Sequence, residues 1–172
     1  MMRRIGSILV LFLLFSCQER NSVSVNTPHA DWNDRKAGEK VMDAAVQGKT
    51  YLPVYSHIYH IQQDRIFNLT VTASIRNISS RDTVYLLKAD YYNTTGMKVR
   101  EYLEFPVYIC PMETLEIIIG ETDETGGSGA NFIFDWAMGE GVDPPLFEAV
   151  MISTHGQQGL SFTTRGVEIT HE

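Results

Sequence analysis

The feature that most constrains the fold is a strict alternation of apolar and polar side chains between residues 67 and 76. The apolar side chains occupy the odd positions: Phe67, Leu69, Val71, Ala73 and Ile75. Successive side chains of a β-strand point to opposite faces of a sheet, so the pattern predicts a strand with one buried face and one face in water. A helix would instead repeat its apolar residues every three or four positions.

The same two-residue period recurs from Lys49 onward and predicts about eight strands. They cover residues 50–59, 67–76, 85–91, 99–109, 114–121, 131–137, 147–154 and 160–169. Turn-forming residues separate them, and the pattern contains no long amphipathic helix. Short antiparallel strands rich in β-branched and aromatic residues are typical of an immunoglobulin-like β-sandwich. A small closed β-barrel is the alternative.

The first 16 residues have a different pattern, that of a secretory signal peptide. Arg3 and Arg4 precede an apolar run over residues 5–15, and Ser16 is a small residue in front of Cys17. The run of about 11 residues is too short to cross a bilayer, which needs roughly 20. A cysteine directly after the expected cut resembles the lipid-modified cysteine of bacterial lipoproteins. This resemblance implies a lipid anchor at Cys17 that holds the protein at a membrane of the bacterial envelope.

The residues that follow Cys17 predict where the anchor lies and how the domain is attached to it. Lipoproteins retained in the inner membrane usually have Asp after the cysteine, whereas this chain has Gln18, so the resemblance implies the outer membrane. Residues 17–48 are mostly polar and predict a lipidated N-terminus followed by a flexible tether. Residues 49–172 are then the β-sandwich domain.

Charge and cysteine content exclude several classes of protein. The chain has 14 basic and 21 acidic residues, and an acidic surface repels the phosphates of nucleic acids. We therefore expect no nucleic-acid partner. With Cys17 modified by lipid, Cys110 has no cysteine left to pair with, which predicts a domain without an intramolecular disulfide. We expect Cys110 to be a buried, unreactive thiol.

Six blocks of the chain together resemble one bacterial family. They are Thr50–Tyr59, Leu69–Thr72 with Ile75–Asn77, Asp90–Tyr92, Gly126–Phe132, Glu148–Ile152 and Gln157–Thr163. In this order they are similar to domain of unknown function 3124, a family of short secreted or lipid-anchored proteins. The resemblance covers roughly residues 49–169 and implies an envelope location. It implies no activity and no functional residue, because the family has none assigned.

A glycine-rich segment, Gly126-Gly127-Ser128-Gly129-Ala130, is one letter from the Gly-x-Ser-x-Gly motif of serine hydrolases. That motif needs a helix after the serine, whereas Asn131 begins a predicted strand. We therefore expect no catalytic role for Ser128.

The same segment has a second interpretation as a ligand site. Glycines at 126, 127 and 129 permit left-handed backbone angles, which can direct several N–H groups at one anion or polar ligand. Asp123 and Glu124 precede these glycines and Asn131 follows them, which completes the candidate site; the two carboxylates could instead favour a cation. The simpler interpretation is a glycine-rich hairpin connection.

Histidines and carboxylates suggest a possible metal site. The candidate ligands are His57, Asp123, Glu148 and His155, a set that would suit zinc or copper. His57 and His60 cannot share an ion on a regular strand, because residues three apart face opposite sides. Satisfied or surface histidines are the simpler expectation.

Two functions remain open from the sequence. The first is a noncatalytic binding or structural module without a cofactor, whose tyrosine-rich strands could contact an envelope protein, a peptide or a glycan. The second is a zinc- or copper-binding envelope protein, or a metal-dependent enzyme. The first is favoured because no convincing catalytic set is present in the sequence.

Overall fold

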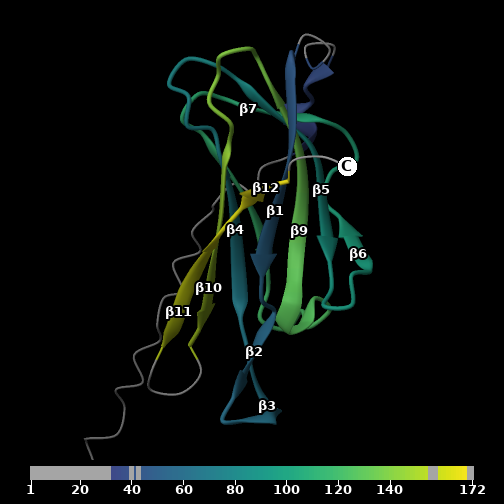
Figure 1. Cartoon of the computed structure of the whole chain (residues 1–172), viewed down its shortest axis with the longest axis vertical. Coiled ribbons are helices and arrows are strands. Elements are labelled where there is room, and N and C mark those ends of the chain that lie inside the picture. The colour runs from purple at the N-terminus through teal and green to yellow at the C-terminus, as the bar shows by residue number, and fades with distance from the viewer. Residues whose placement is uncertain (1–31, 39–40, 42–43, 155–158, 170–172) are drawn as a thin grey trace, which may run out of the picture.

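The protein is an antiparallel β-sandwich (Figure 1). The computed structural model describes residues 32–38, 41, 44–154 and 159–169. Within this part of the chain, twelve strands form a six-stranded sheet, a four-stranded sheet and a separate two-stranded hairpin. None of these sheets closes into a barrel, so the sandwich prediction is confirmed over the barrel alternative.

The six-stranded sheet has the order β12-β1-β9-β5-β6, and β7 also pairs with β5. Its strands are β1 (Val46–Val54), β5 (Val84–Tyr92), β6 (Lys98–Glu101), β7 (Val107–Ile109), β9 (Ala130–Met138) and β12 (Val167–Glu168). The four-stranded sheet has the order β11-β10-β4-β8. Its strands are β4 (Thr70–Arg76), β8 (Thr114–Ile119), β10 (Leu146–Ser153) and β11 (Leu160–Arg165).

Three smaller elements lie at the two ends of the sandwich. The strands β2 (His57–His60) and β3 (Gln62–Asn68) form a hairpin that projects from the lower end in Figure 1. The 3-10 helix η3 (Gly127–Gly129) lies between β8 and β9, next to β2. The 3-10 helix η1 (Trp32–Arg35) packs near β7, at the other end.

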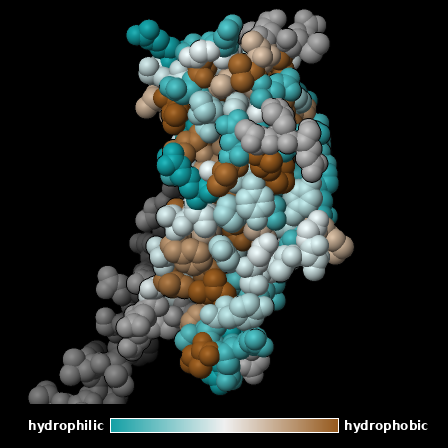
Figure 2. Space-filling view, in the orientation of Figure 1, coloured by the Kyte–Doolittle hydropathy of each residue, from teal (hydrophilic) through white to brown (hydrophobic). Residues whose placement is uncertain are grey.

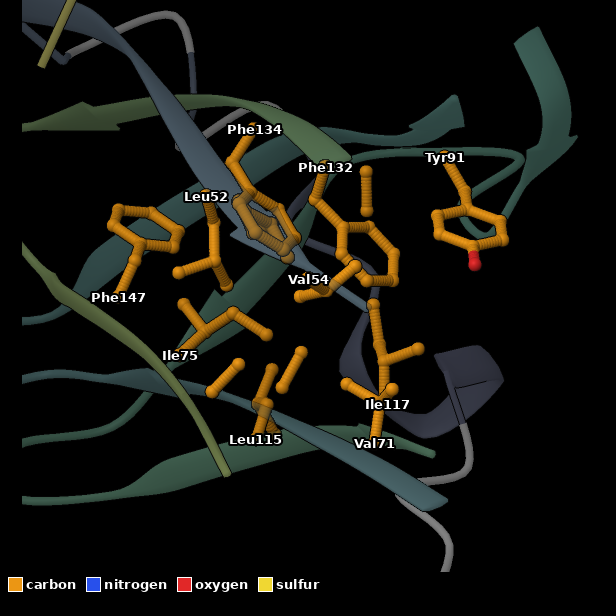
Figure 3. Close-up of a cluster of buried hydrophobic side chains, with 14 of the residues drawn as sticks. Leu52, Val54, Val71, Ile75, Tyr91, Leu115, Ile117, Phe132, Phe134 and Phe147 are labelled. Carbon is orange, nitrogen blue, oxygen red and sulfur yellow. The ribbon is translucent and has the colours of Figure 1, made fainter. Parts of the chain in front are cut away.

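The core lies between the two sheets and is built by the alternation seen in the sequence. On β4, Val71, Ala73 and Ile75 are fully buried. Aromatic rings of β9 stack across to the other sheet, with ring centroids of Phe134 and Phe147 4.8 Å apart (Figure 3). One continuous apolar layer therefore joins the two sheets.

Four of the predicted strands are each divided in two. The predicted strand 50–59 is divided into β1 and β2, and the predicted strand 67–76 covers the end of β3 and all of β4. In the same way, 99–109 is divided into β6 and β7, and 160–169 into β11 and β12. The first two breaks share one cause. Ser56 is fully buried, its N–H donates to the Gly127 carbonyl at 3.0 Å, and its own carbonyl accepts from Leu69 N–H at 2.8 Å. The backbone thus leaves its sheet to bond with two loops.

Part of the predicted tether lies against the domain. Arg35 and Glu113 form an ion pair of 2.6 Å, the Lys36 ammonium lies 4.3 Å from the centre of the Phe105 ring, and Ala37 N–H donates to Pro106 O at 3.0 Å. The boundary predicted at residue 49 falls inside β1.

The structure also bears on the two cysteines. The prediction of a buried thiol at Cys110 is wrong, because this residue is exposed. It follows the buried Ile109 in the turn after β7, so the alternation turns it outward. Cys17 and the signal peptide, residues 1–16, lie outside the described residues. Within the described ranges no helix is long and apolar enough to cross a membrane.

Candidate functional site

The glycine-rich loop and the β2–β3 hairpin meet at one end of the sandwich, which we call the hairpin end. Strand pairing brings them together, because Val54 at the end of β1 pairs with Ala130, and Tyr92 at the end of β5 pairs with Asn131. The hairpin end therefore contains most of the candidate residues from the sequence.

Gly126 is packed against a buried hydroxyl pair. The Ser56 hydroxyl and the Tyr91 hydroxyl lie 2.9 Å apart in a hydrogen bond, and both residues are fully buried. A Cβ atom at Gly126 would overlap the Tyr91 hydroxyl and come within 2.7 Å of Ser56 Oγ. Only glycine therefore fits at position 126 without a shift of the core. Burial raises the pKa of Tyr91, and the hydrogen bond with Ser56 opposes that effect only in part.

Thr94 holds the rest of the loop. Its hydroxyl donates to the Gly126 carbonyl at 3.0 Å and accepts from the Gly129 N–H at 2.9 Å. The Gly127 carbonyl accepts from Ser56, and Gly127 has a φ of 76°, in the left-handed region. Through these contacts the polar groups of the loop close it onto the turn after β5 and onto the residue before β2, as expected of a structural connection. Ser128 lies in η3, and strand β9 follows rather than a helix.

Asp123 is held by charge and hydrogen bonds. Its carboxylate pairs with the Arg100 guanidinium at 2.9 Å and accepts from the backbone N–H and hydroxyl of Thr125. Burial would raise the pKa of Asp123, but the bonds from Thr125 and Arg100 outweigh it and hold the pKa below its usual value. Arg100 also donates to the Tyr102 hydroxyl at 2.9 Å, so the carboxylate fixes the loop to β6.

His57 and Asn68 are two described residues at the hairpin end that each have a buried side-chain atom without a hydrogen-bond partner. They face each other in the β2–β3 register. Asn68 donates its amide to the Glu124 carboxylate at 2.7 Å, whereas its carbonyl oxygen and His57 Nδ1 are buried without a hydrogen-bond partner. A small polar ligand or an ion could use these two atoms.

Glu148, another predicted metal ligand, lies away from this end. Glu148 pairs in register with Ser74, away from the Thr70 end of β4, and forms an ion pair of 3.6 Å with Arg76. His155 lies outside the described residues. Among the residues that the structure describes, no group of three or more His, Cys, Asp or Glu could hold a metal ion. His57 and His60 do not lie on one regular strand, because a β-bulge separates Tyr59 from His60.

The hairpin tip carries a feature that sequence analysis missed. The side chains of Tyr59, Ile61 and Ile66 are 59%, 81% and 42% exposed. Figure 2 shows a brown apolar group at this end, within a teal surround. An open hollow at the tip is lined by Tyr59, Ile61, Gln62 and Gln63. The signal was present in the sequence as bulky apolar residues within a short polar connection between predicted strands.

The fold and this end of the molecule define an antiparallel β-sandwich protein with a closed glycine loop and a projecting hairpin. The chain belongs to the family described as "Protein of unknown function (DUF3124)", whose model matches residues 47–169. The resemblance seen in the sequence is therefore confirmed.

Two further comparisons add no function. No curated protein matches the chain at a significant level. A solved chain described as "Crystal Structure of Thermotoga maritima 1070" is similar at a TM-score of 0.45 and 13% identity, over 70% of this chain and 92% of that chain. A similarity at this level carries over neither an activity nor a partner.

Proposed function

We propose that the protein is a noncatalytic binding module, anchored by lipid at Cys17 to the outer membrane of the bacterial envelope. One structural observation supports the noncatalytic part. The polar groups of the glycine loop bond to Ser56, Thr94 and Arg100 and so close the structure, rather than converging on a substrate. The signal-like pattern of residues 1–17 supports the anchor. The partner is an envelope component: a protein, a peptide or a glycan.

Lipid labelling tests the anchor. Cells that produce the wild-type chain should incorporate labelled palmitate into it, and Cys17→Ser should abolish the label. Cys110→Ser is the matched control, because Cys110 is an exposed cysteine in the folded domain. Equal labelling of wild type and Cys17→Ser would contradict the anchor.

Activity assays test the absence of catalysis. The purified chain should hydrolyse no ester, peptide or glycoside substrate above the rate of Ser128→Ala. A hydrolytic activity that Ser128→Ala abolishes would refute the proposal, because Ser128 is the serine of the hydrolase-like motif.

A zinc- or copper-binding protein is the second candidate. The unpartnered His57 Nδ1 and Asn68 Oδ1 atoms favour it, with Glu124 next to them. It predicts stoichiometric metal in protein purified without chelators, lost in His57→Ala and retained in the control His60→Ala. Elemental analysis measures both, and metal-free wild type with unchanged melting on metal addition would exclude this candidate.

A further inference from the structure

The hairpin tip exposes more bulky apolar surface than a short turn needs. Ile61 is 81% exposed, and Tyr59 and Ile66 flank it on the two strands. Large apolar side chains gathered on a projecting element are typical of interaction sites. Tyr59 and Ile61 also line the open hollow at the tip.

The backbone of Ile61 is strained, which points away from a purely structural role. Its φ is 63°, in the left-handed region that β-branched residues rarely adopt. Asn or Gly would fit this position with less strain. Such strained residues cluster at functional sites. An exposed isoleucine therefore lowers stability here without filling any core.

The tip and Trp32, the first described residue after the predicted lipid anchor at Cys17, lie at opposite ends of the domain. Trp32 begins the described chain beside β7, at the end of β5 opposite to the hairpin. The nine residues of β5 span about 30 Å, and the hairpin adds about 15 Å more. About 15 residues separate Cys17 from Trp32, and a chain of that length reaches at most about 50 Å when fully extended. The tip would meet the anchoring membrane only if that segment ran straight along the whole domain.

The chemistry of the tip favours a protein partner. The sequence of residues 57–68 contains one acidic and one basic residue, so this segment has no formal net charge in an acidic chain. Isoleucine side chains offer a glycan few polar contacts, whereas they fill apolar grooves on proteins well.

We infer that the β2–β3 hairpin inserts Tyr59, Ile61 and Ile66 into an apolar groove of another envelope protein. The inference rests on the proposed function, because it takes the domain to be held at the membrane through Cys17. The closed glycine loop supports the base of the hairpin, since Ser56, directly before β2, donates its N–H to the Gly127 carbonyl.

Photocrosslinking in cells that produce the full chain tests this contact. A benzophenone amino acid at position 61 should give one discrete adduct with another protein, identified by mass spectrometry. The same amino acid at position 112 is the control. Met112 is also exposed, at 69%, and also has a positive φ, but it lies in the turn after β7. Adducts with lipid, with a second copy of the chain, or at both positions alike would overturn the inference.

Binding of the purified partner to the purified full chain gives the second test. Ile61→Asn should weaken binding at least about 10-fold while raising the melting temperature by about 2–4 °C, because Asn tolerates the left-handed backbone. Met112→Asn should raise the melting temperature similarly and leave binding unchanged. Unchanged affinity in Ile61→Asn would overturn the inference.

The two proposals fail in different ways. Palmitate labelling is measured in the same cells as crosslinking. Labelled protein without a protein adduct at position 61 overturns the docking inference alone. Unlabelled protein with the adduct overturns the anchor and leaves the docking contact supported, whereas loss of both overturns both.

Discussion

At the scale of single residues, Gly126 shows how close packing selects a residue type. A Cβ atom there would overlap the Tyr91 hydroxyl and lie 2.7 Å from both Ser56 Oγ and Ala130 Cβ. We expect Gly126→Ala to destabilise the domain by about 1–3 kcal/mol through overpacking. Chemical denaturation measures the change. The control Gly120→Ala, where no atom lies within 4 Å of the added Cβ, should change stability by less than about 1 kcal/mol.

The buried hydroxyl pair allows a second prediction at this scale. Tyr91→Phe removes the bond to Ser56 and leaves a buried hydroxyl without its partner, which should cost about 1–3 kcal/mol of unfolding free energy. Adding Ser56→Ala should cost less in that background than in the wild type, because the bond is already lost. Strictly additive losses in a double-mutant cycle would show that the two hydroxyls are not coupled.

At the scale of elements, one ion pair attaches η1 to the turn before β8. The hydrogen bond from Arg35 lowers the pKa of Glu113 below its usual 4.5, burial opposes the shift, and the charge of Arg35 adds to it. Because the folded-state pKa is the lower one, the carboxylate stabilises the fold at neutral pH. This contribution is lost as the pH falls below about 4.5 and through the folded-state pKa.

We therefore expect Glu113→Gln to destabilise the domain at pH 7 by about 0.5–1 kcal/mol, since the pair is about three-quarters buried. The difference from wild type should shrink at pH 3. Urea denaturation at both pH values measures it, with the exposed Glu140→Gln as the control. A difference that persists undiminished at pH 3 would contradict the role of this charge.

At the scale of the whole molecule, Phe134 joins the two sheets. It stacks on Phe132 of its own strand, with ring centroids 5.2 Å apart, and on Phe147 of the facing sheet (Figure 3). Phe134→Ala should lower the free energy of unfolding by about 3–5 kcal/mol, because it opens a cavity between the sheets. The control Ile118→Ala, on a side chain 44% exposed, should cost less than about 1 kcal/mol.

A single unfolding transition should persist in both variants, because one core joins the sheets. Calorimetry and circular dichroism would then report the same midpoint. Two separate transitions would show that the sheets unfold independently and that Phe134 does not couple them.

Most of the fold was accessible from the sequence, because alternation is a local property. The pattern over residues 67–76 predicted the burial of Val71, Ala73 and Ile75 on β4, but it placed Ser74 in water, whereas Ser74 is buried. The same period located most of the other strands and missed most of β3. The points at which predicted strands are divided in two could not be predicted from the sequence. The break at Ser56 depends on bonds to Gly127 and Leu69, and the outward position of Cys110 depends on where β7 ends.

Some features of the candidate site could likewise be predicted from the sequence, and others depend on the tertiary structure. The sequence by itself determined an all-β chain, its family and the glycine loop, because strand period, turn residues and motif blocks are contiguous along the chain. Only the tertiary structure decided that Gly126 packs on Tyr91, that Glu148 lies apart from His57, and that Ile61 stands exposed at a projecting tip. These facts depend on contacts between residues far apart in sequence and on backbone angles, which no local pattern specifies.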